Sequence, residues 1–325
     1  MQICKNLLED AVRTRAFPGA VLAVGDEKGI LFEETAGRLS PDPDSPEVQP
    51  DTIYDVASLT KVVVTTTLAM RLFEEARLDL DAPVEEFTVR QLLTHSAGLP
   101  AEPRKDSSPN LAGVFSGLLP LQYKPGAKVL YSDAGFIILG QIIEGIAGAP
   151  LDVLAQERIF GPLGMKDTCF NPNPAQLVRI APTGPDTRGA VHDKAAAAMG
   201  GIAGHAGLFS TARDLAIFGR MMLRGGKTIE LFTRMDGSVP GSTRALGWDT
   251  PSERGSSSGS HFSRESFGHT GFTGTSMWID PKRRLYAVFL TNRVYSDPGN
   301  LQIRDIRPRV HDAVMLSLSA AGVKK

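Results

Sequence analysis

Apolar residues recur at helical spacing in several stretches of the chain, which places them on one face of a helix. These stretches are residues 3–15, 58–76, 89–94, 136–147, 212–223 and 306–320. Pro18-Gly19 ends the first of these helices, and Thr211 with Asp214 resembles a capping box that begins the helix at residue 212. The sequence therefore predicts a chain whose middle is mostly helical.

A second pattern, alternation of apolar and polar residues, predicts a β-hairpin near each end of the chain. The strands of these two hairpins are residues 20–24, 30–35, 275–279 and 285–291. Gly25 and Gly29 bound the first connection, a spacing typical of hairpin loops, and Asp280-Pro281 lies in the second. Strands are thus expected at both ends of the chain and helices between them.

This arrangement predicts an α/β (α+β) fold, in which one antiparallel sheet from both chain ends is flanked by helices. A mostly helical subdomain is inserted between the two ends. We expect residues 1–57 and 230–325 to form the discontinuous α/β subdomain, and residues 58–229 the helical one, together as one structural unit. A length of 325 residues is sufficient to bury a full core.

Composition and charge exclude several classes of protein. The 35 lysines and arginines against 36 aspartates and glutamates give a net charge of −1, which offers no electrostatic footprint for nucleic acid or an anionic membrane. With 42% hydrophobic and 22% charged residues, the chain is neither a fibre nor a disordered tail. Cys4 and Cys169 cannot form a disulfide framework or a four-thiolate metal site, and we interpret them as reduced, buried thiols.

No segment has the sequence pattern of a membrane span or a secretion signal. The most apolar stretch, residues 136–155, is interrupted by Gln141, Glu144 and Asp152, and therefore predicts a core helix. The first residues lack a basic region followed by an apolar one. We therefore expect a cytoplasmic protein, or a periplasmic or secreted one if a leader was removed. The sequence makes no prediction of the oligomeric state.

Ser58-Leu59-Thr60-Lys61 is the first candidate for chemistry. Residues three apart share a helical face, so the Lys61 amine can reach the Ser58 hydroxyl. Serine is a weak nucleophile until a neighbour takes its proton, and a lysine with a depressed pKa can do so. The positive end of the helix favours an oxyanion beside Ser58. Alone, the motif is weak, because about one such spacing is expected by chance in a chain of this length. A capping serine and a solvated lysine would then explain it.

Two further elements strengthen this candidate. Tyr131-Ser132-Asp133 precedes an apolar helix, and His269-Thr270-Gly271 precedes a predicted strand whose backbone can present amides to a ligand. The order S-x-x-K, then Y-x-N or a variant, then K-T-G or H-T-G resembles serine β-lactamases and penicillin-binding proteins. The tyrosine is similar to that of the class C β-lactamase branch, with its esterase and D-aminopeptidase relatives. Further similar segments are residues 92–100, 125–144, 203–215 and 268–281.

The resemblance implies a role for each matching residue. Ser58 would be the acylated nucleophile and Lys61 its activating base, while Tyr131 would pass protons to the leaving group and help to activate the hydrolytic water. The backbone N–H groups of Ser58 and Phe272 would form the oxyanion hole, in which each donor contributes about 2.7–4 kcal/mol to the transition state. The residues that would contact the substrate are Asp133, His269, Thr270 and Gly271. We expect no cofactor and no metal ion.

Two positions depart from the family pattern. Asp133 replaces the usual asparagine, which donates an amide to a substrate carbonyl, and an ionised aspartate has no donor. Asp133 could instead pair with Lys61 and keep it charged, which would make Tyr131 the resting base. His269 replaces the lysine of K-T-G, and imidazole is mostly neutral at pH 7. Both changes favour simple esters over β-lactams.

Three other patterns have simpler explanations. Residues 255–259 satisfy G-x-S-x-G, but they lie in a polar linker, whereas a nucleophile elbow joins a strand to a helix. Residues 94–98 are a near miss of the same pattern and predict a structural helix end. His192, Asp193 and His205 match no common metal-ligand spacing, and we interpret them as structural.

The sequence thus predicts a serine hydrolase that forms an acyl-enzyme on Ser58, as a class C β-lactamase-like esterase of short-chain esters. The substrate would be a small-molecule ester or amide. The alternative is a true β-lactamase or a D-Ala-D-Ala carboxypeptidase. Further alternatives are a penicillin-binding module without turnover, which would show a burst and no steady state, and a metal-dependent hydrolase, which a chelator would inactivate.

Overall fold

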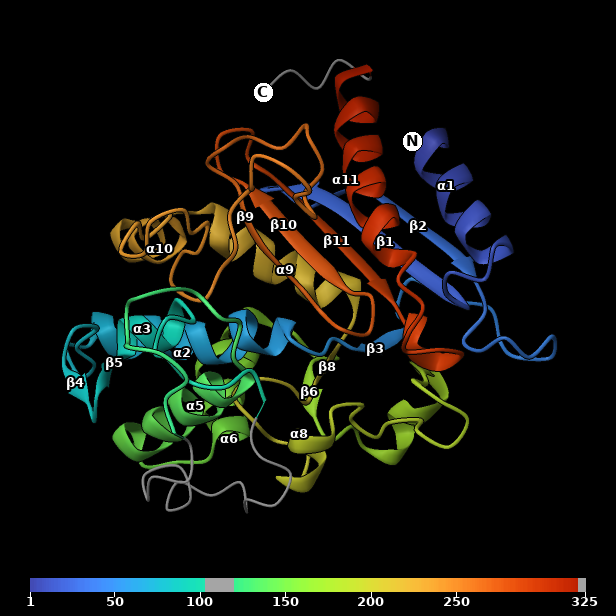
Figure 1. Ribbon diagram of the computed structural model, residues 1–325. Coiled ribbons are helices and arrows are strands. Elements are labelled where there is room, and N and C mark those ends of the chain that lie inside the picture. Colours follow the sequence, from blue (N-terminus) through green and yellow to red (C-terminus); the bar gives the residue numbers. More distant parts are fainter. Residues whose placement is uncertain (103–119, 321–325) are drawn as a thin grey trace.

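The structure is a computed structural model that describes residues 1–102 and 120–320 (Figure 1). The helices are α1 (Gln2–Arg13), α2 (Thr67–Glu74), α3 (Val89–Leu93), α5 (Asp133–Ala147), α6 (Leu151–Ala155), α7 (Gly161–Leu163), α8 (Lys194–Ala198), α9 (Ala212–Leu223), α10 (Lys227–Thr233) and α11 (Ile303–Ala320). The strands are β1 (Gly19–Asp26), β2 (Ile30–Gly37), β3 (Ile53–Asp55), β4 (Pro83–Val84), β5 (Phe87–Thr88), β6 (Cys169–Phe170), β7 (Ile180–Ala181), β8 (Leu208–Ser210), β9 (Phe267–Thr270), β10 (Ser276–Asp280) and β11 (Leu285–Thr291). Short π- or 3₁₀-helical segments are η1 (Lys61–Thr66), η2 (Gln156–Phe160), η3 (Pro174–Arg179) and η4 (Arg293–Tyr295).

The main sheet joins the two ends of the chain. Its strand order is β2-β1-β11-β10-β9, and every neighbouring pair is antiparallel. The first strand lies beside the last, with Val21 opposite Leu290. The two predicted hairpins are β1–β2 and β10–β11, so the predicted antiparallel sheet from both ends is confirmed.

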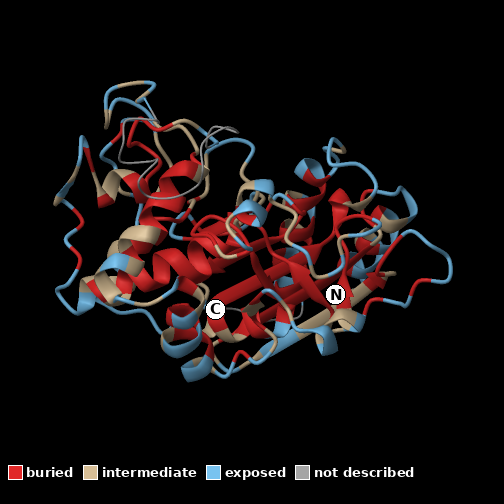
Figure 2. Ribbon diagram, turned by 90° about the horizontal axis from the view of Figure 1, so that it is seen from below, coloured by how far each residue is buried: buried red, intermediate tan, exposed pale blue. Residues whose placement is uncertain are grey.

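Both faces of this sheet are covered by helices, because its strands alternate apolar side chains toward two separate cores. Ala20, Leu22 and Val24 of β1 belong to a core shared with α1 and α11, whereas Val21 and Ala23 belong to the larger core. Helix α9 packs against β1 and β11 from that second side. Figure 2 shows the central strands buried along their length, and successive side chains of a strand point to opposite faces of the sheet.

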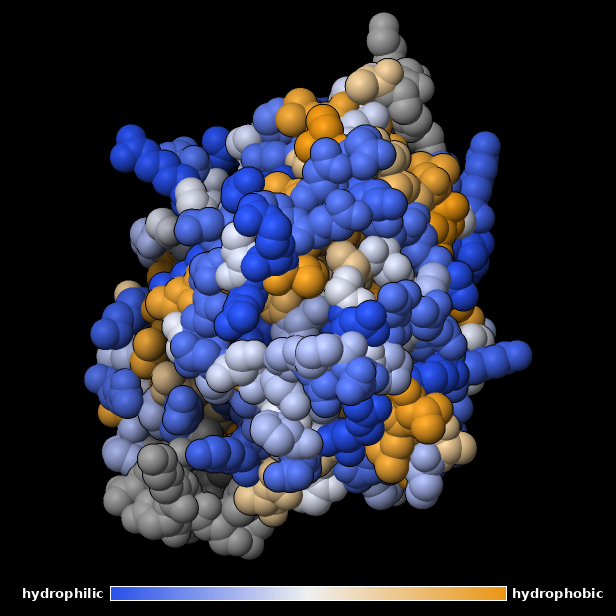
Figure 3. Space-filling model, turned by 90° about the vertical axis from the view of Figure 1, so that its right-hand side faces the viewer, coloured by the Kyte–Doolittle hydropathy of each residue, from blue (hydrophilic) through white to orange (hydrophobic). Residues whose placement is uncertain are grey.

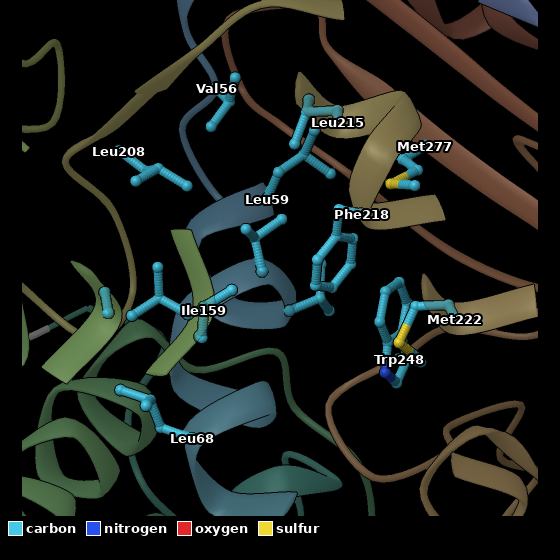
Figure 4. Packing of buried hydrophobic residues seen from close by; sticks show 14 of the residues in the cluster. Val56, Leu59, Leu68, Ile159, Leu208, Leu215, Phe218, Met222, Trp248 and Met277 are labelled. Atoms are coloured by element: carbon cyan, nitrogen blue, oxygen red, sulfur yellow. The ribbon is translucent and has the colours of Figure 1, made fainter. Parts of the chain in front are cut away.

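The larger core connects the main sheet to the middle of the chain. Figure 4 shows Phe218 and Met222 of α9 close to Trp248, with Leu59 and Val56 in the same cluster. The rings of Phe218 and Trp248 are stacked at a centroid distance of 6.3 Å. The segment that carries the S-x-x-K motif is therefore anchored in the core of the protein.

The two predicted subdomains share elements across their predicted boundaries. Strand β3 precedes the boundary at residue 57, yet it pairs with β7 and β8, which belong to the middle of the chain. Helix α9 lies on the helical side of residue 229, yet it packs on the main sheet. These contacts cross both predicted boundaries, and the division into two subdomains of one structural unit remains a prediction.

Helix α9 begins where the sequence predicts, but its predicted capping box is only half formed. The Thr211 hydroxyl accepts the N–H of Asp214 at 3.1 Å, as an N-cap does. The Asp214 carboxylate does not return this bond. It accepts from the Asp167 N–H and the Thr168 hydroxyl, both at 2.8 Å. Asp214 therefore ties α9 to the segment before β6, a contact distant in sequence.

The predicted core helix in the middle of the chain is α5. Its residues Phe136 and Leu139 are fully buried. Over the ranges 1–102 and 120–320, no single helix is long and apolar enough to cross a membrane, and α5 passes that test only together with residues Leu151–Leu163, at a bend of 77°. On the face of the molecule in Figure 3, hydrophobic side chains form separate patches among hydrophilic ones.

Candidate active site

Ser58 lies in the turn between β3 and the helical segment that contains Lys61. The preceding residue, Ala57, has a φ of 49°, which is uncommon for a residue with a Cβ. The Asp55 carboxylate holds this turn: its Oδ1 accepts the Ala57 N–H at 2.8 Å, and its Oδ2 accepts the His192 N–H at 2.7 Å. Asp55 is 2% exposed, so the turn that presents Ser58 rests on a buried acid.

The environment of Asp55 changes its acidity. Burial raises the pKa of this carboxyl to about 6, although the two N–H groups that it binds act in the opposite direction. The negative charge of Asp193 adds to the rise. Asp55 therefore changes its protonation state near pH 6, whereas an aspartate in water does so near pH 4.

Lys61 lies at the centre of the site and is fully buried. Its Nζ donates to Oγ of Ser58 at 3.0 Å and to the carbonyl oxygen of His205 at 3.0 Å. It also lies 2.6 Å from Oδ1 of Asp133, with which it forms an ion pair. The predicted contact between Ser58 and Lys61, and the predicted pairing with Asp133, are both present.

Tyr131 and Asp133 together determine the charge of the lysine. Burial lowers the pKa of Lys61, but the adjacent Tyr131 and the Asp133 carboxylate raise it by more, so that the pKa lies above its ordinary value. Lys61 is therefore an ammonium at neutral pH. In this state it can donate to Ser58 but cannot accept the Ser58 proton.

Tyr131 and Asp133 reach the site because a cap begins helix α5 between them. The Ser132 hydroxyl accepts the Gly135 N–H at 3.0 Å and donates to the Pro100 carbonyl at 2.6 Å. Asp133 is consequently the first residue of α5, and Tyr131 directly precedes the helix. The Nζ of Lys61 lies 4.9 Å from the centre of the Tyr131 ring.

Two neutral histidines flank the Tyr131 ring, with centroid distances of 4.4 Å for His95 and 6.0 Å for His269. Burial lowers the pKa of each well below its usual range, and the charges of Arg244 and Lys61 add to this effect. Nδ1 of His95 accepts the Ser132 N–H at 3.0 Å. Nδ1 of His269 lies 2.8 Å from the Thr270 carbonyl and so carries the proton, which leaves its Nε2 as an acceptor.

The H-T-G segment is bound directly to the turn that carries the nucleophile. The Gly271 N–H donates to the Thr275 carbonyl at 2.7 Å, and the Thr275 hydroxyl donates to the Val56 carbonyl at 3.0 Å. A Cβ on Gly271 would lie 2.1 Å from the Thr275 hydroxyl and 2.5 Å from the Val56 carbonyl. Only glycine allows the two segments to approach this closely.

The two amides expected to form the oxyanion hole remain unbound within the described residues. Neither the Ser58 N–H nor the Phe272 N–H donates to a protein acceptor there. The Phe272 side chain is 53% exposed and stacks on His192 at 5.7 Å, and the Arg293 guanidinium lies 4.8 Å from its ring. These contacts fix the position of the residue that carries the second amide.

Arg244 is a site residue that the sequence analysis missed. Its guanidinium carbon lies 5.5 Å from the centre of the Tyr131 ring. It comes from the irregular segment before β9, where no periodicity or motif marks a functional position. The only local signal is its place two residues before Leu246-Gly247-Trp248, a segment whose Trp248 is fully buried.

His95 was also missed, because the motif at residues 94–98 was interpreted as a helix end. Helix α3 does end at Leu93, and His95 has a φ of 56° in the turn that follows. The turn, however, directs the imidazole onto Tyr131. A histidine in a left-handed conformation directly after a helix is the signal that could have drawn attention to it.

The remaining candidates lie as follows. Residues 252–263 contain no strand or helix, so the G-x-S-x-G pattern there is not a nucleophile elbow.

Nε2 of His205 lies 2.8 Å from Oδ1 of Asp193, and the His205 carbonyl accepts a hydrogen bond from the Lys61 ammonium. His205 thus supports the position of Lys61. In the parts of the chain that the structure describes, no group of three or more histidine, cysteine or acidic side chains could hold a metal ion.

Comparison with known proteins agrees with this geometry. The model of the family described as Beta-lactamase matches residues 4–309. The chain belongs to the beta-lactamase family. It is also 34% identical to a putative D-alanyl-D-alanine carboxypeptidase of Salmonella paratyphi B, over 82% of this chain and 74% of the relative.

Solved structures show the same fold. A class C beta lactamase from Rhodobacter sphaeroides superposes with a TM-score of 0.74 at 21% identity and covers 97% of this chain and 100% of its own. EstCE1, a hydrolase with promiscuous acyltransferase activity, gives a TM-score of 0.72 at 20% identity, with 94% and 98% covered. The predicted β-lactamase/transpeptidase-like fold is confirmed. This is the fold of the β-lactamase family of hydrolases.

Proposed function

We propose that this member of the β-lactamase family is a serine hydrolase that forms an acyl-enzyme on Ser58 and acts on esters of small acyl groups. The observation that carries the proposal is the position of Lys61 Nζ, 3.0 Å from Ser58 Oγ and 2.6 Å from Asp133 Oδ1. This geometry orients the serine oxygen and holds a positive charge beside it. The proposed substrate is a small-molecule ester.

Acylation begins with attack of Ser58 Oγ on the acyl carbonyl carbon. Because Lys61 is already protonated, it does not take the Ser58 proton; Tyr131 enters the step as a phenolate stabilised by the adjacent ammonium, takes the Ser58 proton and becomes a neutral phenol. The carbonyl oxygen becomes an oxyanion bound by the N–H groups of Ser58 and Phe272. When the carbon–oxygen bond to the leaving group breaks, Tyr131 returns the proton to the leaving alkoxide.

Deacylation repeats these steps with water. Tyr131 takes a proton from the water molecule that attacks the acyl carbon, the same two amides bind the oxyanion, and the bond to Ser58 Oγ breaks. The proton returns to Ser58, and a carboxylic acid leaves. Lys61 supports these steps, because its Nζ lies 3.0 Å from Ser58 Oγ and 4.9 Å from the centre of the Tyr131 ring.

Two features favour esters over β-lactams. Asp133 forms an ion pair with Lys61 and has no N–H to donate to the amide carbonyl of a β-lactam side chain. His269 is neutral and 3% exposed, so it does not supply the charge of the K-T-G lysine. D-Ala-D-Ala carboxypeptidase activity is the second candidate, and the name of the Salmonella relative favours it.

Active-site labelling tests the nucleophile. Treatment with a fluorophosphonate, followed by intact-mass measurement and peptide mapping, should place one label on Ser58, and Ser58→Ala should lose turnover and retain its melting temperature. A label on Ser96 or Ser257 would overturn the assignment.

Parallel rate measurements on a short-chain aryl ester, a cephalosporin and a D-Ala-D-Ala peptide then rank the substrates. A burst without a steady state on all three would indicate a binding module.

A further inference from the structure

The turn that carries the second amide of the proposed oxyanion hole is bound by a buried arginine of helix α11. Nη2 of Arg307 donates to the carbonyl oxygen of Gly271 and, at 3.0 Å, to that of Thr275. The Gly271 carbonyl and the Phe272 N–H belong to the same peptide group. Arg307 therefore contacts one end of the peptide whose other end is the proposed oxyanion donor.

The charge of Arg307 has no anionic partner in the described part of the chain. The side chain is 9% exposed, and among residues 1–102 and 120–320 it forms no ion pair. Its Nε has no hydrogen-bond partner in the same ranges. Burial and the positive charge of Arg293 lower the pKa of the Arg307 guanidinium to about 9, so the group is still charged at neutral pH.

His311, one turn further along α11, does not compensate this charge. Its Nε2 lies 3.1 Å from Oγ of Ser276, and burial together with the charge of Arg307 lowers the pKa of the imidazole to about 3. A buried charge without a counter-ion costs free energy. A neutral donor could hold the same two carbonyls without that cost, so the position of the turn alone does not require a cation.

We propose that Arg307 is a positioning residue that strengthens the oxyanion hole through the peptide between Gly271 and Phe272. A cation on a carbonyl oxygen draws electron density from the peptide nitrogen, and the N–H of that peptide becomes a stronger donor, as hydrogen bonds in a chain polarise one another. The benefit is largest in the transition state, where the oxyanion forms. The inference rests on the proposed function, in which the Phe272 N–H binds that oxyanion.

Other contacts hold the turn in place independently of Arg307. The Gly274 N–H donates to the Gly271 carbonyl at 3.1 Å. The Thr273 hydroxyl donates to the Asp55 carbonyl at 2.8 Å, and the Arg293 N–H donates to the Thr273 carbonyl at 3.0 Å. A change at Arg307 that leaves these bonds intact should therefore alter the strength of the donor more than its position.

The first experiment measures hydrolysis of a short-chain aryl ester by the wild type, Arg307→Lys, Arg307→Gln and Arg309→Gln. Lysine retains the charge, and glutamine retains an N–H donor without it. Arg309 is an exposed arginine of the same helix and controls for net charge.

We expect kcat and kcat/KM of Arg307→Gln to fall by the same factor, about tenfold, because the lost interaction acts in the transition state. This is less than the roughly 10²- to 10³-fold loss that follows removal of an oxyanion donor itself. Arg307→Lys should retain most of the activity, and Arg309→Gln all of it. Melting temperatures verify that each variant is folded.

The second experiment observes the peptide directly in the free protein. The sequence contains two Gly-Phe peptides, Gly135-Phe136 and Gly271-Phe272. Glycine labelled with ¹³C at the carbonyl and phenylalanine labelled with ¹⁵N therefore give two correlated NMR signals. In Arg307→Gln the ¹³C of Gly271 and the ¹⁵N of Phe272 should both shift upfield, because the carbonyl has lost a charged donor. The signal of Phe136, which lies inside α5, should not move.

An unchanged Gly271-Phe272 signal in Arg307→Gln, or full ester activity of that variant, would overturn the proposal. A loss of kcat in Arg307→Lys as large as in Arg307→Gln would overturn it as well and leave Arg307 as a structural support of the turn. If Arg307→Gln does not fold, the same measurements on Arg307→Met, whose apolar side chain suits a buried position, decide. If the wild type hydrolyses no ester, the proposed function fails, and the NMR shifts still decide whether Arg307 polarises the peptide.

Discussion

The two walls of the active site differ in how their polar groups are satisfied. On the wall that follows β3, Lys61 has three partners, and both oxygens of the Asp55 carboxylate accept N–H groups. On the opposite wall, formed by β9 and the segment before it, Arg244 and Nε2 of His269 have none among the described residues. A buried polar group without a partner costs free energy, which applies to Nε2 of His269, whereas the partly exposed Arg244 is accessible to water.

This difference indicates that the paired wall serves catalysis and the unpaired wall serves substrate recognition. The paired wall fixes the protonation state of Lys61 and the position of Ser58 before a substrate arrives, which is the preorganisation that catalysis requires. The unpaired wall offers a charge and an acceptor with which a substrate can pair. Variants of the paired wall should therefore change turnover on every substrate, and variants of the unpaired wall should change the preference between substrates.

The largest effect is expected from the pair Lys61 and Tyr131. Lys61→Ala and Tyr131→Phe should each lower kcat on an aryl ester about 10²- to 10⁴-fold, because one residue holds the charge and the other moves the proton. The double variant should lose little more than either single variant, since residues that act as one unit are not additive. Steady-state rates of the four proteins check this. Losses that multiply would show that the two residues act independently.

A smaller effect is expected from Asp133, which together with Tyr131 keeps Lys61 charged. Asp133→Asn removes the ion pair at 2.6 Å and introduces an amide donor. Ester hydrolysis should fall about tenfold, because the electrostatic support of Lys61 is lost, and the ratio of cephalosporin to ester turnover should rise. Asp133→Glu retains the charge and provides the control. A wild type that hydrolyses cephalosporins faster than aryl esters would contradict this interpretation.

Much of the paired wall could be predicted from the sequence, because local spacing determines it. The three-residue separation of Ser58 and Lys61 brings them together on one turn, and a capping serine places Tyr131 and Asp133 at the start of α5. The strands at the two ends of the chain were predictable from alternation, and they form the sheet that carries His269.

The residues that the sequence analysis missed act through contacts that are distant along the chain. His95 binds the Ser132 amide, 37 positions away. Asp55 ends the short strand β3, and its carboxylate binds the His192 amide, 137 positions away. Arg244 lies in an irregular segment whose path depends on the burial of Trp248. No periodicity or motif contains such information, because it arises only when the chain has packed.

The smallest and most distinctive effect concerns Asp55, whose carboxylate supports the turn of Ser58 without touching the substrate. The folded pKa of about 6 lies above the ordinary value of 3.8. The native state therefore binds this proton more tightly than the unfolded state does, and ionisation of Asp55 opposes folding. The free energy of unfolding should decline by about 3 kcal/mol as the pH rises from 4 to above 6, from this group alone.

Activity should change in the opposite direction. Above pH 6 both carboxylate oxygens accept N–H groups and hold Ala57 and His192, whereas the protonated acid loses one acceptor and the turn loosens. The value of kcat/KM on a neutral ester should consequently fall below pH 6 while the free energy of unfolding increases. Asp55→Asn, which has no titrating group, should lose both trends and keep a low activity between pH 5 and 8. Urea unfolding and ester hydrolysis at matched pH values measure the two slopes. If the wild type and Asp55→Asn showed the same pH dependence of unfolding free energy and of kcat/KM, a group other than Asp55 would be titrating. A supporting role for Asp55 requires both quantities to depend on its charge.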